Sequence, residues 1–119
     1  MIDSKVLIVE GKTDKERLQK IIDEPVCFIC TFGTLSEEKI EQLIVPLHDE
    51  DVYIFVDADD SGNALRSRLK QELPNARHLY TRRVYREVAK TPLSYLAEIL
   101  WKAHFVVHEE YLSGEMTEF

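Results

Sequence analysis

The sequence predicts an α/β fold in which a four-stranded parallel sheet is flanked by helices and followed by one extra helix near the C-terminus. Two observations predict it. Apolar runs of strand length alternate along the chain with segments whose apolar residues recur at helical spacing. The strand runs are also apolar throughout, which is typical of parallel strands covered on both faces. Right-handed crossovers would then place helices on both sides of the sheet.

The first half of the chain holds two strand–helix units. Residues 5–9 form an apolar strand, and the capping-box pattern Thr13-Asp14-Lys15-Glu16 begins a helix. Residues 26–30 form the second strand, which is followed by the loop Thr31-Phe32-Gly33-Thr34. A second helix is expected from about Ser36. Its apolar residues at helical spacing are Ile40, Leu43, Ile44 and Leu47.

The second half begins with a third strand at residues 52–56, which leads through an Asp-rich turn into a helix. Leu65, Leu69 and Leu73 mark the apolar face of that helix, and Pro74-Asn75 ends it. Residues 76–80 form a short fourth strand. The result is a Rossmann-like order of strands and helices without a dinucleotide-binding fingerprint.

A basic loop over residues 81–90 precedes the extra C-terminal helix, which is expected over about residues 92–107. Thr91-Pro92 supplies an N-cap followed by proline at the first helical position. The acidic tail after His108 has no clear pattern. The apolar face of this helix comprises Leu93, Leu96, Ala97, Leu100, Trp101 and Phe105.

Length and composition favour one soluble domain over residues 1–119, with its core at about residues 5–80. The chain has 119 residues and is 45% hydrophobic, which is enough for a single buried core. It contains no apolar run of membrane-spanning length and no secretory leader pattern, so we expect a cytoplasmic protein with no membrane partner. Cys27 and Cys30 lie three apart in a strand and point to opposite faces, which predicts buried, reduced thiols.

The net charge of -7 conceals a strong asymmetry along the chain. Residues 1–60 sum to -9, residues 61–90 to +6 and residues 91–119 to -4. The basic stretch directly follows an Asp pair, as contact of a phosphodiester with both a metal ion and arginines requires. Ordinary solvated charges on helices and loops are the alternative interpretation.

Acidic residues follow the first and third strands, at the edge where parallel strands place their ligands. Glu10, Asp57 and Asp59 are expected to converge there although 47 residues separate Glu10 from Asp57. Such an anionic cluster raises its own pKa values unless a divalent cation relieves it. Asp57 and Asp59 face the same way and suit Mg²⁺, with Mn²⁺ as a substitute. Asp14 is a candidate for contacting the ion through water, and Asp60 either does the same or caps the following helix.

Three other phosphate-handling motifs fit less well. A P-loop needs a glycine five positions before Gly11, where this chain has Val6. A two-component receiver would use Asp57 as its phospho-acceptor, but the first strand ends in one Glu rather than an acidic pair. A phosphatase with an aspartyl nucleophile places its Asp pair after the first strand, not the third. The receiver remains a remote alternative.

The two acidic motifs together resemble the TOPRIM domain. The first strand ends in Glu-Gly-Lys-x-Asp at residues 10–14, and the third in Asp-x-Asp-x-x-Gly at residues 57–62. The family includes topoisomerases of types IA and II, bacterial primases and several nucleases. Ser61 departs from the third Asp of type II topoisomerases, and the tyrosine-bearing domain of topoisomerases has no counterpart here. In size and in its Asp-x-Asp-x-Ser-Gly motif, the chain is most similar to small stand-alone members and to the nucleases that mature ribosomal RNA.

The resemblance implies a site and a function. Glu10 is similar to the family's general acid/base and contributes to the metal site, and Asp57 and Asp59 are similar to its Mg²⁺ ligands. Gly11 and Gly62 match its turn glycines, and Gly33 belongs to a loop that lines the same edge. The expected reaction is Mg²⁺-dependent phosphoryl transfer on RNA or DNA, most simply phosphodiester hydrolysis. The candidate phosphate contacts are Lys12, Arg66, Arg82, Arg83 and Arg86.

A non-catalytic module that binds Mg²⁺ and nucleic acid, or that regulates a partner protein, is the alternative from another class. Two minor possibilities concern a histidine pair near the end of the chain and a tyrosine in the basic loop. His104 and His108 lie four apart on the expected last helix, where ordinary surface positions are favoured over a metal clamp. Tyr85, between arginines, either stacks a nucleobase or packs on the surface.

Overall fold

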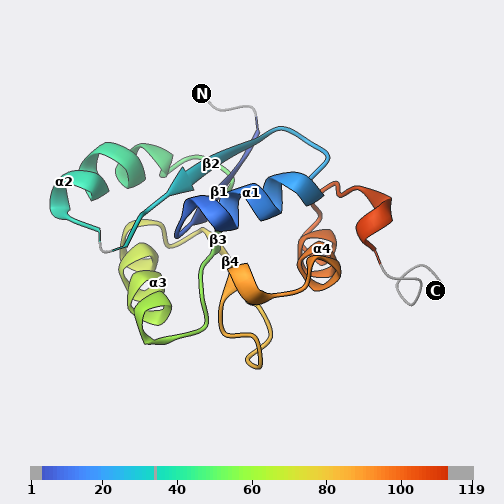
Figure 1. Ribbon diagram of the computed structural model, residues 1–119. Coiled ribbons are helices and arrows are strands. Elements are labelled where there is room, and N and C mark those ends of the chain that lie inside the picture. Colours follow the sequence, from blue (N-terminus) through green and yellow to red (C-terminus); the bar gives the residue numbers. More distant parts are fainter. Residues whose placement is uncertain (1–3, 34, 113–119) are drawn as a thin grey trace.

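The computed structural model describes residues 4–33 and 35–112 (Figure 1). Its sheet has four parallel strands in the order β2-β1-β3-β4, which confirms the predicted architecture. The strands are β1 (Lys5–Val9), β2 (Val26–Cys30), β3 (Val52–Phe55) and β4 (Arg77–Leu79). β1 and β3 occupy the centre of the sheet and pair with each other, so the residues that follow them emerge side by side.

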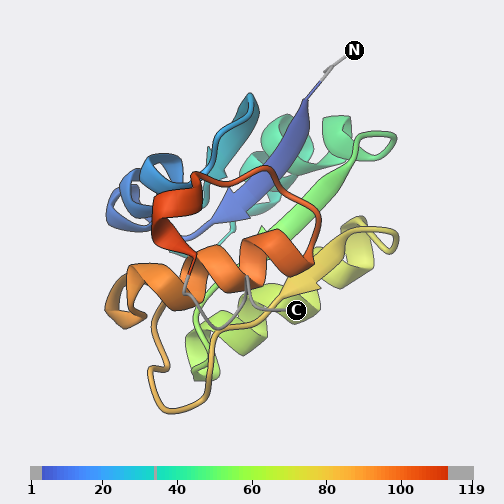
Figure 2. The ribbon, with the colours of Figure 1, turned by 90° about the vertical axis from the view of Figure 1, so that its right-hand side faces the viewer.

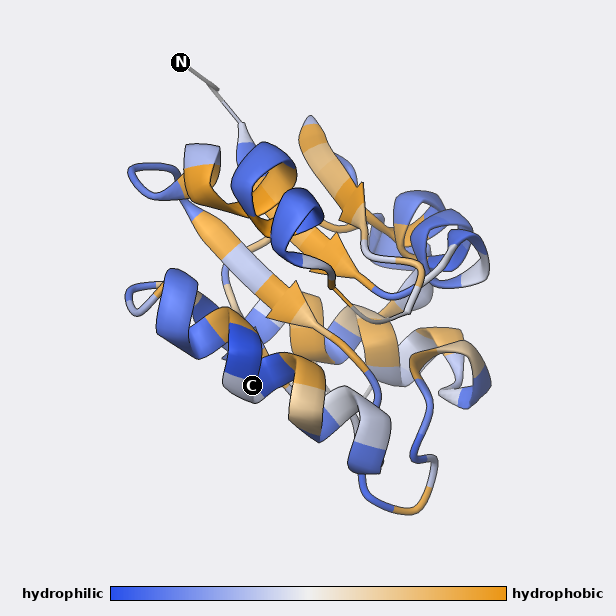
Figure 3. Ribbon diagram, turned by 90° about the vertical axis from the view of Figure 1, so that its left-hand side faces the viewer, coloured by the Kyte–Doolittle hydropathy of each residue, from blue (hydrophilic) through white to orange (hydrophobic). Residues whose placement is uncertain are grey.

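Helices cover both faces of the sheet (Figures 1 and 2). On one face, Leu7 and Phe55 pack with side chains of α1 (Lys12–Ile21) and α4 (Leu93–Lys102). On the other, Ile8 and Ile54 pack with side chains of α3 (Asp60–Glu72) and of the segment after β2. In Figure 3, β1, β2 and β3 are largely hydrophobic, whereas the helices around them carry both hydrophilic and hydrophobic residues.

The two half-buried cysteines lie on opposite faces of the sheet. Cys27 packs against the core on the α3 side and Cys30 against the core on the α4 side, so they point to opposite faces as predicted. Both thiols are free, and they are partly rather than fully buried because β2 is an edge strand. None of the helices that the structure describes is long and apolar enough to span a membrane.

The predicted second helix is irregular. α2 comprises only Glu37–Lys39, after an N-cap at Ser36, and it continues as a π turn over Ile40–Ile44 and a 3₁₀ turn over Val45–Leu47. The Val45 N–H donates to the Ile40 carbonyl five residues back, and Pro46 has no N–H to donate. Because the wider turn breaks the 3.6-residue period, Leu43 is 38% exposed instead of lying on the buried face.

The first helix begins earlier than predicted. Gly11 is its N-cap and α1 starts at Lys12, so the expected capping box at residues 13–16 was wrong by two positions. The Asp14 carboxylate accepts a hydrogen bond from the Gly11 N–H at 3.1 Å. The acidic side chain that caps this helix therefore comes from inside its first turn.

The last helix is shorter than predicted, because α4 ends at Lys102 rather than near residue 107. His104 has a positive φ of 70°, which turns the chain and returns the buried Phe105 to the core. Val107 then forms an antiparallel bridge with Ile22. His104 and His108 therefore do not share a helix, and the His108 Nδ1 lies 3.7 Å from the Asp23 Oδ2. Residues 109–111 form a 3₁₀ turn, and the rest of the expected acidic tail lies outside the described residues.

Candidate functional site

Glu10 and Asp57 meet at the carboxyl edge of the sheet because β1 and β3 are hydrogen-bonded neighbours. The Glu10 Oε2 accepts a hydrogen bond of 2.8 Å from the backbone N–H of Asp57. This contact joins residues 47 apart in the sequence. The prediction that the two strand ends bring these residues together agrees with the structure.

Asp57 is also tied to the loop that follows β4. Its Oδ1 accepts a hydrogen bond of 2.8 Å from the Val88 N–H, and the next residue, Ala58, donates to the Arg86 carbonyl at 2.6 Å. Arg17 of α1 fixes the same loop by donating to the carbonyls of Val88 and Ala89, at 2.9 and 2.7 Å. The loop therefore lies against the acidic edge. Nothing in the sequence pattern indicated Arg17 or these backbone groups.

Asp59 caps the helix that leaves this edge. It is the N-cap of α3, and its Oδ1 accepts from the Gly62 N–H at 2.7 Å. A Cβ at Gly62 would lie 2.0 Å from the Asp57 carbonyl oxygen, so only glycine fits. At Gly11, by contrast, the nearest atom to such a Cβ is the Asp14 Oδ2 at 3.8 Å. Of these two predicted turn glycines, only Gly62 is required by close packing.

The loop after β2 forms another side of the edge. The Phe32 N–H donates to the Glu10 carbonyl at 2.8 Å, and the Thr31 N–H donates to the Val9 carbonyl at 3.0 Å. Phe32 and Gly33 both have positive φ, of 53° and 101°. Positive φ is ordinary for glycine but costs a bulky residue about 1–2 kcal/mol. Thr34, also predicted in this loop, lies outside the described residues.

Burial and like charges together raise the pKa of carboxyl groups at this edge. Burial of the Glu10 carboxyl raises its pKa, the Asp57 N–H lowers it, and the Asp57 and Asp59 carboxylates raise it again, so that the pKa reaches about 7. Burial and the Asp57 charge also raise the pKa of Asp14. Asp60 is exposed in the first turn of α3. The edge thus carries more negative charge than its surroundings relieve.

The donor chemistry fits a hard cation. Backbone N–H groups hold one oxygen of Glu10, Asp57 and Asp59, which restrains all three carboxylates at the edge. Across residues 4–33 and 35–112, no three Asp, Glu, His or Cys side chains form a ready metal-binding group. Mg²⁺ does not demand one, since it commonly takes one or two carboxylates and completes its shell with water and phosphate oxygens.

The predicted phosphate contacts fall into two classes. Arg82, Arg83 and Arg86 are exposed on the loop after β4, and the Arg82 guanidinium lies 4.2 Å from the Tyr95 ring centroid. Tyr85 packs against the same ring, at 5.6 Å between centroids. The exposed Lys12 Nζ lies 3.9 Å from the Glu16 Oε1. These four cations are exposed, and the loop that carries the three arginines contacts the acidic edge through the hydrogen bond from the Ala58 N–H to the Arg86 carbonyl.

Arg66 lies in the core instead. It is 4% exposed, and its guanidinium donates to the Val56 and Leu79 carbonyls at 3.0 and 2.6 Å. A second guanidinium nitrogen lies 3.1 Å from the His78 Nδ1, and the group stacks on the Tyr80 ring at 4.1 Å. Because these donors bond protein atoms and the side chain is buried, we do not retain Arg66 among the proposed phosphate contacts.

Comparison with known proteins identifies the family. The family model of the Toprim domain matches residues 5–88. The chain belongs to the Toprim domain family. A small TOPRIM domain protein from Bacillus stearothermophilus has a similar structure, with a TM-score of 0.88 and 42% identity over 95% of this chain and 96% of that chain. This family membership favours the TOPRIM interpretation over a receiver.

Two curated relatives extend the comparison. The uncharacterized protein YusF of Bacillus subtilis (strain 168) is 48% identical over 91% of this chain and 74% of its own length. Ribonuclease M5 of Mycoplasma genitalium (strain ATCC 33530 / DSM 19775 / NCTC 10195 / G37) is 36% identical over 63% of this chain. The match spans only 42% of the ribonuclease's length. The chain therefore resembles less than half of the length of this ribonuclease.

Proposed function

We propose that this protein hydrolyses phosphodiester bonds of nucleic acid in a Mg²⁺-dependent reaction, with RNA as the first candidate substrate. The observation that carries the proposal is the pairing of Glu10 with Asp57 at the carboxyl edge, with Asp59 close enough to raise the Glu10 pKa. The similarity to ribonuclease M5 proteins supports RNA as the substrate in this proposal. Membership of the Toprim family supports the proposed dependence on Mg²⁺.

Glu10 is the proposed group that moves the proton. In the absence of a metal ion, burial and the neighbouring carboxylates raise the Glu10 pKa to about 7. A carboxyl held at this edge suits the role of general acid or base. The Asp57 N–H fixes the Glu10 Oε2, so the side chain is held in one orientation. This arrangement presents the proton-transferring oxygen from a rigid strand end rather than from a mobile loop.

Asp57 and Asp59 are the proposed ligands of Mg²⁺ or Mn²⁺, with Glu10 nearby. The ion, when bound, supplies Lewis acidity to the scissile phosphate and to a water molecule. Asp57 is restrained by the Val88 N–H and Asp59 by the Gly62 N–H, so neither carboxylate needs to be ordered on binding. Asp14 and Asp60 are proposed to contact the ion only through water.

Cations beside the edge are proposed to hold the flanking phosphates. Arg82, Arg83 and Arg86 are exposed on the loop that contacts Ala58 and Asp57. Lys12 starts α1, two residues after Glu10. Contacts of this kind position the substrate without reading its sequence. Binding is therefore expected to weaken steeply with added salt.

Cleavage assays with purified protein test the proposal. Structured RNA, single-stranded RNA and duplex DNA are incubated with Mg²⁺, with Mn²⁺ and with a chelator, using wild type, Glu10→Gln and Asp57→Asn. We expect metal-dependent cleavage by wild type and loss of cleavage in both variants, while calorimetry shows Mg²⁺ binding that Asp57→Asn weakens. Cleavage that persists in both variants would refute the assigned roles.

A non-catalytic module is the second candidate, and a specific observation favours it. The chain matches less than half of the ribonuclease M5 length, so the larger enzyme has segments that this chain does not match. As a module, the protein would bind Mg²⁺ and nucleic acid and would depend on a partner protein for chemistry. The same assay separates the two candidates, because a module binds RNA without cutting it and Glu10→Gln leaves that binding unchanged.

A further inference from the structure

A pocket of about 290 Å³ opens directly beside Glu10. It lies between the loop after β2 and the outer side of α3, and its lining includes Glu10, Gly33, Leu35, Ala64, Leu65 and Arg68. Its volume is close to the lower end of the roughly 300–1,000 Å³ of small-ligand pockets. Glu10 belongs both to the pocket and to the proposed catalytic edge. Any occupant of the pocket would therefore lie next to the phosphodiester bond that the proposed reaction cleaves.

The charges of this pocket disfavour a second phosphate. Its one basic side chain, Arg68, is paired with Glu37 at 2.6 Å and lies 3.9 Å from Glu72. Its other charged group, Glu10, repels anions whenever it is ionised. Leu35, Ala64 and Leu65 supply apolar surface. These features suit an uncharged, largely apolar group rather than an anion.

An exposed aromatic residue directly precedes Gly33 of the pocket lining in the sequence. Phe32, the residue before Gly33, is 69% exposed and has a φ of 53°. Its backbone is held there by the hydrogen bond to the Glu10 carbonyl. An exposed aromatic ring on a strained backbone forgoes burial, so the fold itself gains little from it. The ring is available to stack on a flat ligand.

We propose that this pocket and Phe32 hold one unpaired nucleobase of single-stranded RNA, on the nucleotide next to the scissile phosphate. The inference rests on the proposed function, since the phosphate at Glu10 is what brings a base to the pocket. A base is flat and uncharged, and its ring faces, unlike its polar edge, can lie against apolar side chains and stack on the Phe32 ring. A paired base has its hydrogen-bonding edge covered and its faces stacked in the helix, so the nucleotide must be single-stranded here.

Fluorescent RNA binding tests the inference, with Ca²⁺ in place of Mg²⁺ so that a hard cation neutralises the carboxylates without the Mg²⁺-dependent cleavage. A series of single-stranded RNA oligonucleotides carries 2-aminopurine at successive positions, and stacking on an aromatic ring quenches its fluorescence. The protein is used as wild type, Phe32→Ala, Phe32→Tyr and Ala64→Leu, the last of which fills the pocket from the exposed face of α3. Trp101→Ala is the matched control, because it removes an aromatic ring that is 48% exposed at the far end of α4.

We expect quenching at one position in wild type and in Phe32→Tyr. Phe32→Ala and Ala64→Leu are expected to abolish that quenching and to weaken binding by about 5-fold to 100-fold, the range of one base stack. Trp101→Ala is expected to leave both unchanged. An abasic nucleotide at the same position is expected to weaken wild-type binding and to remove the effect of Phe32→Ala.

The outcomes separate this inference from the proposed function. Uniform quenching along the strand, or binding that neither Phe32→Ala nor Ala64→Leu changes, overturns the base pocket even if the protein cleaves RNA. Position-specific quenching without cleavage supports the pocket and refutes hydrolysis by this chain. A wild type that binds no RNA overturns the base pocket together with RNA as the substrate.

Discussion

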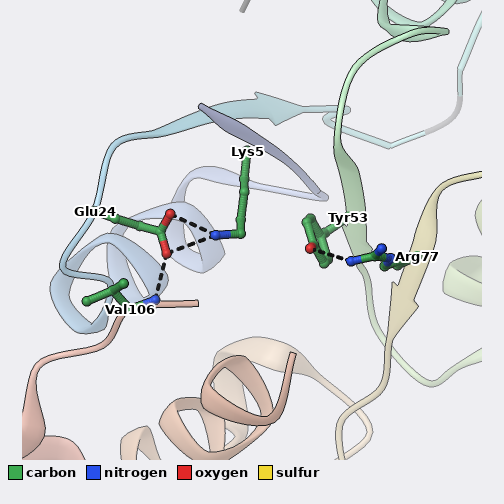
Figure 4. A network of polar contacts seen from close by, with 5 residues as sticks. All are labelled: Lys5, Glu24, Tyr53, Arg77 and Val106. Carbon is green, nitrogen blue, oxygen red and sulfur yellow. Dashed lines mark hydrogen bonds and ion pairs between the residues drawn. The ribbon is translucent and has the colours of Figure 1, made fainter. Parts of the chain in front are cut away.

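The two ends of β1 carry glutamates in opposite situations. At the amino end of the strand, the Lys5 Nζ lies 2.9 and 3.1 Å from the two carboxylate oxygens of Glu24, and the Val106 N–H donates to the same carboxylate at 2.6 Å (Figure 4). At the carboxyl end, the Glu10 carboxylate accepts one hydrogen bond, from the backbone N–H of Asp57, and lies near the carboxylates of Asp57 and Asp59. Among the hydrogen bonds and ion pairs of the described residues, only the Glu24 carboxylate is paired with a cation.

The pKa values report the difference. Burial alone would raise the pKa of Glu24, but the Val106 N–H and the Lys5 ammonium more than offset it, and the pKa is lowered. Burial and the neighbouring carboxylates raise the pKa of Glu10 to about 7. The amino end therefore stabilises the fold, whereas the carboxyl end keeps negative charge that folding does not relieve. Unrelieved charge of this kind is typical of sites that bind or react.

Replacing the glutamate at each end of β1 by glutamine is expected to give the largest difference in activity. Under the proposed function, Glu10→Gln lowers kcat for RNA cleavage by about 10²- to 10⁴-fold, because it removes the proton-transferring group. Glu24→Gln leaves kcat unchanged, since Glu24 lies at the opposite end of the strand. Steady-state kinetics with Mg²⁺ measure both. Equal losses in the two variants would show that the ends do not differ in role.

Gly62→Ala tests how rigidly the carboxyl end is built. The added Cβ meets the Asp57 carbonyl oxygen at 2.0 Å, and the strain is expected to lower the free energy of unfolding by about 1–3 kcal/mol. Gly11→Ala, at the corresponding turn after β1, is expected to stay within about 0.5 kcal/mol of wild type because its Cβ has room. Urea unfolding measures both variants, and similar losses would contradict the distinction.

Removing the charge at the amino end is expected to cost stability instead of activity. Glu24→Gln loses the ion pair with Lys5 and weakens the bond from Val106, which predicts a decrease of about 1–2 kcal/mol in the free energy of unfolding. Glu10→Gln, measured without metal at pH 8, is expected to cause no such decrease, since it removes one of several clustered anions. A larger loss in Glu10→Gln would reverse the comparison.

The smallest expected effect is a pH dependence at the amino end. The pKa of folded Glu24 lies below its usual value of 4.5, so its contribution to stability is complete above pH 4.5 and is lost as the pH falls through the folded value. Below pH 4.5, wild type should therefore lose stability more steeply than Glu24→Gln. Urea midpoints between about pH 3 and 6 give this slope, and parallel curves would exclude the Glu24 contribution.

Local patterns were sufficient for the sheet and for the acidic residues. Apolar runs predicted β1 and β2 to the residue and placed β3 and β4 within one residue at each end. Parallel pairing then required that Glu10 and Asp57 emerge at one edge. Helix ends were predicted less well. Pro46 and the π turn altered the second helix, and the turn at His104 shortened the last one.

The polar partners inside the site could not be predicted in the same way. Arg66 belongs to a basic stretch and resembles a phosphate ligand in the sequence, but α3 turns it inward to the Val56 and Leu79 carbonyls. The Val88 N–H that restrains Asp57 has no side-chain signature at all. Each contact joins segments whose sequence separation carries no periodic signal.

By itself, the sequence determined the strand order along the chain, the two acidic motifs and the edge at which they meet, because hydrophobic periodicity and strand direction are local properties. Only the tertiary structure decided which charges are relieved. Lys5 reaches Glu24, and Arg66 reaches two backbone carbonyls, whereas Glu10 faces Asp57 and Asp59. The energy of a charge depends on its burial and on neighbours within a few ångströms, and packing alone sets both.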